Sequence, residues 1–186
     1  MDTFKSLIRR NLSSKKVLLF FLLATIAYLL MLFVTIPKVM AFSDEMRLLD
    51  MMPTGYDLSY VTKLLTTLGQ EGRDTYLYSQ IPLDMIYPLL FGIGYCLILA
   101  FFLNKMNKLK APYLYLCLLP LIAGTADYLE NIGIITLLKS YPDISESMVS
   151  LTNIFSIVKS SSTTLYFIIL IVTLLVLGIK SINNKH

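Results

Sequence analysis

Long apolar runs alternate with short polar stretches along the chain, and this pattern predicts helices. Four runs reach the roughly twenty residues that cross about 30 Å of hydrocarbon. They cover residues 17–36, 85–103, 112–138 and 151–179. The pattern therefore predicts an all-α, polytopic integral membrane protein, in which residues 1–186 form a single transmembrane domain built as a four-helix bundle.

The one long connection, residues 37–83, has a helical pattern of its own. Apolar residues from Leu58 to Leu68 recur at spacings of three and four, which predicts an amphipathic helix that begins at Asp57. Residues 43–52 are expected to form a second, shorter helix. Together these helices are expected to form a small amphipathic helical cap on the outer side of the bundle.

Composition supports a membrane protein and removes several other classes. The chain is 56% hydrophobic and 15% charged, with a mean hydropathy of +0.69, which is too apolar for a soluble domain of this size. Its only histidine is His186, and Cys96 and Cys117 form no C-x-x-C pair. A histidine-ligated metal site and a thiol redox enzyme are therefore disfavoured. We expect neither a metal nor a cofactor.

The basic residues predict an orientation. Ten lysines and arginines fall in residues 1–16, 104–111 and 180–186, whereas five fall in residues 37–84 and 139–150. The positive-inside rule then places both termini in the cytoplasm of a multi-pass membrane protein. The arm at 1–16 is basic and amphipathic, typical of a segment along the membrane surface, and 180–186 would be a cytoplasmic tail. Nothing in this distribution points to nucleic acid as a partner.

Polar side chains inside the apolar runs are the candidate functional residues. Asp127, Glu130 and Asn131 stand at i, i+3 and i+4 and share one helix face. A charged side chain near the centre of a span costs roughly 2.5 to 3.5 kcal/mol, so these residues need polar partners inside a bundle. Folding the chain about residue 144 sets Lys159 opposite Glu130 and leaves only hydroxyl groups, in residues 160–164, opposite Asp127.

These residues predict an outward-opening intramembrane pocket that contains carboxylates. Asp127 and Glu130 are the candidate catalytic pair: Asp127 would hold a proton and act as the acid, while Glu130 stays ionised beside Lys159. The remaining candidates would contact a ligand. They are Asn131, Lys159, Thr163, Tyr166, Asp84, Tyr87 and Arg73.

Three functions remain open at this stage. The pocket would bind a lipid or another hydrophobic small molecule, with or without acid–base chemistry on it. Alternatively, the chain is a structural or accessory membrane subunit whose buried Asp, Glu and Lys only hold helices together. A third function is proton or cation translocation, disfavoured because the inner half of every span is almost purely apolar. Membrane lipid is the expected partner, and the sequence indicates no particular protein partner.

Overall fold

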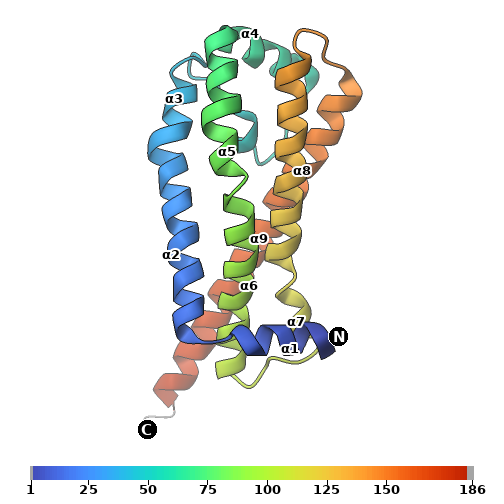
Figure 1. Cartoon of the computed structure of the whole chain (residues 1–186). Coiled ribbons are helices and arrows are strands. Elements are labelled where there is room, and N and C mark those ends of the chain that lie inside the picture. The colour runs from blue at the N-terminus through green and yellow to red at the C-terminus, as the bar shows by residue number, and fades with distance from the viewer. Residues whose placement is uncertain (1, 184–186) are drawn as a thin grey trace.

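The computed structural model describes residues 2–183, which are helical without strands (Figure 1). Nine of the described segments are α-helices, and three short segments are π- or 3₁₀-helical. In chain order the elements are α1 (Asp2–Asn11), α2 (Ser14–Leu30), η1 (Met31–Thr35), α3 (Ile36–Met40), η2 (Leu49–Met51), α4 (Leu58–Thr75), η3 (Tyr76–Gln80), α5 (Ile81–Asp84), α6 (Tyr87–Lys105), α7 (Tyr113–Leu116), α8 (Leu119–Ser140) and α9 (Glu146–Asn183).

Several of these elements join into four helical stretches that are long and apolar enough to cross a membrane. They are Ser14–Met40, Leu58–Lys105, Tyr113–Ser140 and Glu146–Asn183. Each of the four apolar runs in the sequence lies within one of them, to within one residue, so the prediction of four long apolar helices is confirmed. The C-terminal tail at 180–186 is helical to Asn183, and the rest of it lies outside the described residues.

The long helices form an upright bundle with one oblique member. Helix α6 packs against both α2 and α8, and α8 packs along α9. Figure 1 shows α9 crossing behind the other helices from the end covered by α4 to the end that carries α1. We call these the cap end and the α1 end. Ser13 accepts a hydrogen bond from the backbone N–H of Lys16 (3.3 Å) and so begins α2.

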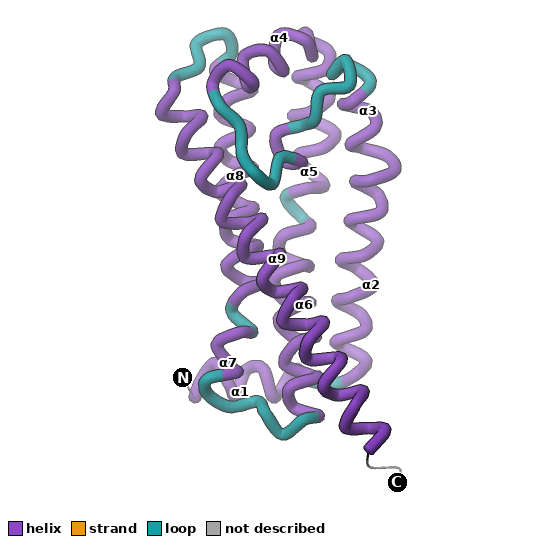
Figure 2. The backbone as a smooth tube through the Cα atoms, turned by 180° about the vertical axis from the view of Figure 1, so that it is seen from behind, coloured by secondary structure: helices purple, strands orange, loops and turns teal. Residues whose placement is uncertain are grey.

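The segment between α3 and α4 differs from the prediction. Residues 46–52 do not form an α-helix: the chain turns at 41–45 and makes only the short helix η2. Asp44 and Glu45 have positive φ angles of 49° and 65°, which interrupts any helix that would begin at Ser43. Leu48 and Leu49 are fully buried instead of lying on one exposed cap face. Figure 2 shows this segment dipping from the cap end into the bundle beside α9.

Helix α4 forms at the cap end as its pattern predicts. The Asp57 side chain caps it by accepting a hydrogen bond from the backbone N–H of Tyr60 (2.8 Å). Its apolar face, from Val61 to Leu68, is buried against the tops of the long helices. Gly69 breaks the regular geometry with φ 60° and ψ −173°, and the helix then resumes and continues into η3 and α5. Gly69 therefore kinks the helix without ending it.

Two separate apolar clusters make up most of the core. One lies at the cap end and includes Leu64, Leu137 and Val149. The other lies toward the α1 end and includes Leu99 and Cys117. Helix α1 closes that end with Ile8, which is buried in the second cluster. A polar layer lies between the two clusters, and it contains the candidate site.

Candidate ligand-binding site

Close packing of α8 and α9 brings the polar layer together. A Cβ added at Gly133 of α8 would lie 2.3 Å from Thr152 Oγ1 of α9, so only glycine permits this approach. On the other side of α8, a Cβ at Gly124 would lie 2.7 Å from the carbonyl oxygen of Pro88. The two glycines let α8 pack closely against both α9 and the start of α6, which places its acidic face, residues 127–131, inside the bundle.

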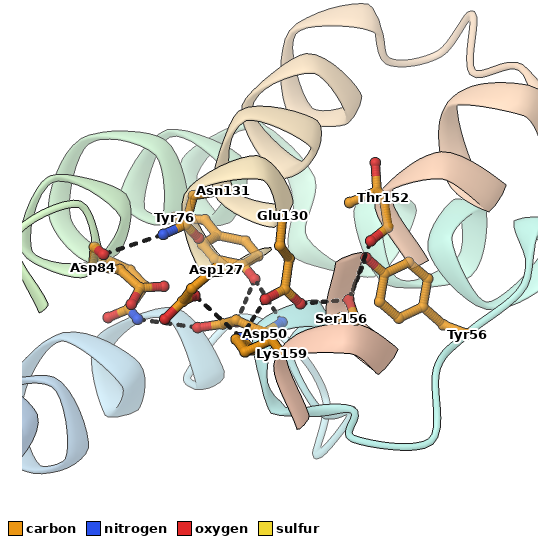
Figure 3. Close-up of polar contacts among 11 residues, drawn as sticks. Asp50, Tyr56, Tyr76, Asp84, Asp127, Glu130, Asn131, Thr152, Ser156 and Lys159 are labelled. Atoms are coloured by element: carbon orange, nitrogen blue, oxygen red, sulfur yellow. Dashed lines mark hydrogen bonds and ion pairs between the residues drawn. The ribbon is translucent and has the colours of Figure 1, made fainter. Parts of the chain in front are cut away.

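Lys159 of α9 contacts both acids of that face (Figure 3). Its Nζ forms an ion pair with Glu130 Oε2 and lies 3.3 Å from Asp127 Oδ1. The predicted contact between Glu130 and Lys159 is confirmed. The expectation that Asp127 faces only hydroxyl groups is wrong, because the long lysine side chain reaches both carboxylates from one position on α9.

The other oxygen of Glu130 begins a chain of hydroxyl groups. Ser156 Oγ lies 2.5 Å from Glu130 Oε1 and 3.2 Å from the Tyr56 phenol oxygen. Serine has a single hydroxyl proton, and the 2.5 Å distance directs it to the carboxylate, so the contact of Ser156 with the Tyr56 oxygen is the weaker of the two. Burial raises the pKa of Tyr56 above its usual value of 10.0, which keeps its hydroxyl group protonated at neutral pH.

The segment that carries Tyr56 is fastened to α9. The backbone N–H of Tyr56 donates to Asn153 Oδ1 (3.0 Å). Gly55 has φ +89°, and a Cβ there would lie 2.2 Å from the same oxygen. Only glycine therefore lets the chain pass this closely to α9 and direct the Tyr56 side chain to Ser156.

Asp50 is a fourth carboxyl group in the layer, and sequence reasoning missed it. Its Oδ1 accepts from the Tyr76 hydroxyl (2.5 Å), and its Oδ2 accepts from Gln80 Nε2 (3.1 Å). Thr35 in turn donates to Gln80 Oε1. Tyr76 and Gln80 are both fully buried. Asp50 occurs in a short apolar stretch that was expected to be a cap helix, so no periodicity indicated an inward position.

A cavity of about 470 Å³ adjoins these groups. Three of the four carboxylates line it, those of Asp50, Asp84 and Asp127, together with Lys159. Its walls combine aromatic and aliphatic side chains with hydroxyl groups of α9. They are Tyr28, Met31, Leu32, Ile36, Met51, Pro53, Tyr87, Phe91, Ala123, Ser160, Thr163 and Thr164.

The cavity opens sideways. Tyr28 and Leu32 on one side are 46% and 37% exposed, and Thr164 of α9 on the other side is also exposed. Toward the cap end, Met51 and Pro53 line the cavity. They belong to residues 41–57, between α3 and α4, which we call the inserted segment. Three of the four exposed wall residues, Tyr28, Leu32 and Thr164, thus lie on the bundle face between the first helical stretch and α9, and the fourth is Pro53.

Asp84 is buried without a complete set of partners. Only 2% of its surface is exposed, and its Oδ2 has no hydrogen-bond partner within residues 2–183. Its backbone carbonyl accepts from Asn131 Nδ2 (3.1 Å), which ties α5 to α8. The side-chain oxygen of Asn131 is likewise buried and unpartnered in the described part of the chain.

The structure brings together most of the candidate residues but not all of them. Tyr87 and Thr163 line the cavity, as do Asp84, Asp127 and Lys159. Glu130 and Asn131 are buried directly behind them. Tyr166 lies outside the cavity, in the cluster toward the α1 end, and donates to the carbonyl oxygen of Tyr95 (2.8 Å).

Arg73 also lies outside the cavity, at the cap end. It donates to the Leu65 carbonyl oxygen (2.7 Å) and stacks over the Tyr141 ring, 4.3 Å from its centroid. These contacts connect the two parts of the kinked α4 and fasten the cap to the turn between α8 and α9.

The site is therefore an acidic cavity that contains one cationic side chain, Lys159. Among residues 2–183, no three Asp, Glu, His or Cys side chains converge as metal ligands. Asp84 and Asp127 line a cavity whose volume is sufficient for a small organic group, and its apolar walls extend to the side of the bundle. Comparisons with protein-family models, curated proteins and solved structures found no match to this chain.

Proposed function

We propose that this chain is a multi-pass membrane protein that binds a lipid or another hydrophobic small molecule in the lateral cavity. The observation that carries the proposal is the cavity itself. It joins buried carboxylates to apolar walls and opens on the side of the bundle, where the hydrocarbon of a membrane would lie. A molecule with a polar headgroup and an apolar tail would match this combination of carboxylates and apolar walls.

Four helical stretches of sufficient length and apolarity support the membrane location. The distribution of lysine and arginine supports cytoplasmic termini, with α4 on the outer side. In that orientation the segment 41–57 enters the bundle at membrane depth. Irregular backbone is tolerated there when protein buries it or when it lines a cavity, and this segment does both.

The geometry divides the acidic residues between two roles. Glu130 is fully buried, bonded to Ser156 and Lys159, and absent from the cavity wall, so it holds α8, α9 and the inserted segment together. Asp84 and Asp127 face the cavity and would contact the ligand. A purely structural subunit accounts for Glu130 but gives no reason for two further carboxylates beside an open space.

A cavity-filling variant tests the proposal. Thr163→Phe places a ring in the cavity, and Ser161→Phe adds the same ring at an exposed position of the same helix. Native mass spectrometry of the purified proteins should detect a copurified hydrophobic molecule on the wild type and on Ser161→Phe, but not on Thr163→Phe. A wild-type protein without a bound molecule, or equal occupancy in all three proteins, would overturn the proposal.

A further inference from the structure

The polar layer contains more carboxyl groups than its one amine can serve. Four are present, Asp50, Asp84, Asp127 and Glu130, and Lys159 is the cation among them. Lys159 contacts Asp127 and Glu130, and Asp50 receives hydrogen bonds from two neutral side chains. Asp84 forms no ion pair with any described residue and, unlike Asp50, has a buried oxygen that receives no hydrogen bond from them.

Asp84 also lines the cavity. It is 98% buried as a residue, and its Oδ2 accepts no hydrogen bond from residues 2–183. A buried acceptor without a donor is unfavourable, and buried polar groups in folded proteins are rarely left so. A molecule in the cavity that carries a donor would satisfy this carboxyl group.

The wall beside Asp84 is aromatic. Tyr87 and Phe91 line the cavity with ring centroids 5.7 Å apart, and Tyr28 adds a third ring 5.9 Å from that of Tyr87. Ring faces attract cations, and the attraction increases when the site excludes water. An organic cation that carries N–H suits both features. It can donate a hydrogen bond to the carboxyl group and lie against the aromatic rings.

We propose that the molecule bound here is an amphiphile with a protonated amine, which donates to the Asp84 carboxyl group and lies against Tyr87 and Phe91. This inference rests on the proposed function and specifies its ligand class. Its apolar tail leaves between Tyr28 and Thr164, where the cavity opens. A volume of about 470 Å³ far exceeds that of a bare ion, which favours an organic headgroup.

Three compounds with the same twelve-carbon tail test the headgroup. Dodecylamine supplies positive charge and N–H, dodecyltrimethylammonium supplies charge alone, and dodecanol supplies neither. The Tm of the purified full-length protein is measured with each compound at equal mole fraction in a nonionic detergent. Dodecylamine at about 100 times its Kd should raise the Tm by about 5 to 10 °C, dodecyltrimethylammonium by less, and dodecanol hardly at all.

Two variants show whether Asp84 is responsible. Asp84→Asn should abolish the Tm increase given by dodecylamine, whereas Asp143→Asn, which removes the same charge from an exposed turn, should keep it. Should Asp84→Asn fail to fold, the compound series on the wild type still decides. Equal shifts with dodecylamine and dodecanol would overturn the amine but leave hydrophobic binding intact. No shift with any compound, and no copurified molecule, would overturn both.

Discussion

Lys159 on α9 forms an ion pair with Glu130 on α8, and the same ammonium group lies 3.3 Å from Asp127 Oδ1. The pair lies between the apolar cluster at the cap end and the cluster toward the α1 end. One cation thus stabilises two carboxylates one helical turn apart, and this sharing determines how the site responds to substitution.

Lys159→Met should be the most damaging single change in the polar layer. It leaves two buried carboxylates without a cation, and removing one partner of a buried pair costs about 3 to 5 kcal/mol. Glu130→Gln should cost less, because Lys159 keeps Asp127 as a partner. Adding Glu130→Gln to Lys159→Met should restore part of the lost stability. Equilibrium unfolding of the four proteins measures the coupling, and additive losses would argue against the pair.

Gly55→Ala should destabilise the protein more than Gly69→Ala. Both positions have positive φ, which alone costs about 1 to 3 kcal/mol for alanine. At Gly69 a Cβ meets no atom within 4 Å, whereas at Gly55 it meets three side-chain atoms of Asn153. The double variant Gly55→Ala/Asn153→Ala should therefore lose less stability than the sum of its single changes. Equal unfolding midpoints for the two alanine variants would contradict the close passage along α9.

Tyr56→Phe should lower the unfolding free energy by about 0.5 to 1.5 kcal/mol at neutral pH, because it removes the buried hydrogen bond between Ser156 and Tyr56. The pKa of Tyr56 is higher in the folded state than in the unfolded state. Its contribution is therefore complete below the unfolded pKa near 10 and falls as the pH rises above it. The stability difference between wild type and variant, followed by denaturation from pH 7 to 11, should narrow above pH 10. A constant difference would show that the phenol is not held protonated.

Cysteine labelling tests the proposed orientation. Cys96 and Cys117 are buried, so the labelling signal should come mainly from single cysteines introduced at exposed positions. In intact cells, Lys63→Cys and Asp143→Cys should react with a membrane-impermeant maleimide, whereas Lys110→Cys should react only after lysis. Labelling of residue 63 or 143 from the cytoplasmic side alone would reverse the orientation.

The four long helices and the contact between Glu130 and Lys159 could be predicted from the sequence. Apolar runs of sufficient length leave few alternatives to helices, and a short turn near residue 144 makes α8 and α9 antiparallel neighbours. Counting outward from that turn paired Glu130 with Lys159. The count is good to about one turn, and a lysine side chain spans that uncertainty, so the second contact, to Asp127, was missed.

The inserted segment was beyond sequence reasoning. Asp50 and Tyr56 enter the bundle through irregular backbone, which has no periodicity that identifies an inward face. Their partners, Tyr76 and Ser156, are 26 and 100 residues away. Gly55 carried the one local signal, a turn between Pro53 and Asp57, but the sequence shows only that the chain turns there and not what it approaches.

Asp127→Asn tests the central claim most directly. It keeps the size of the side chain and its hydrogen bonding while removing a charge from the cavity wall, and Lys159 retains Glu130 as its ion-pair partner. The measurement is native mass spectrometry of wild type and variant, with the Tm of each recorded in the same detergent. A cavity that binds a hydrophobic molecule predicts a bound species on the wild type that is lost from Asp127→Asn at a nearly unchanged Tm. An unfolded variant, or one that keeps the bound species, would show that Asp127 serves packing alone and would contradict the ligand site.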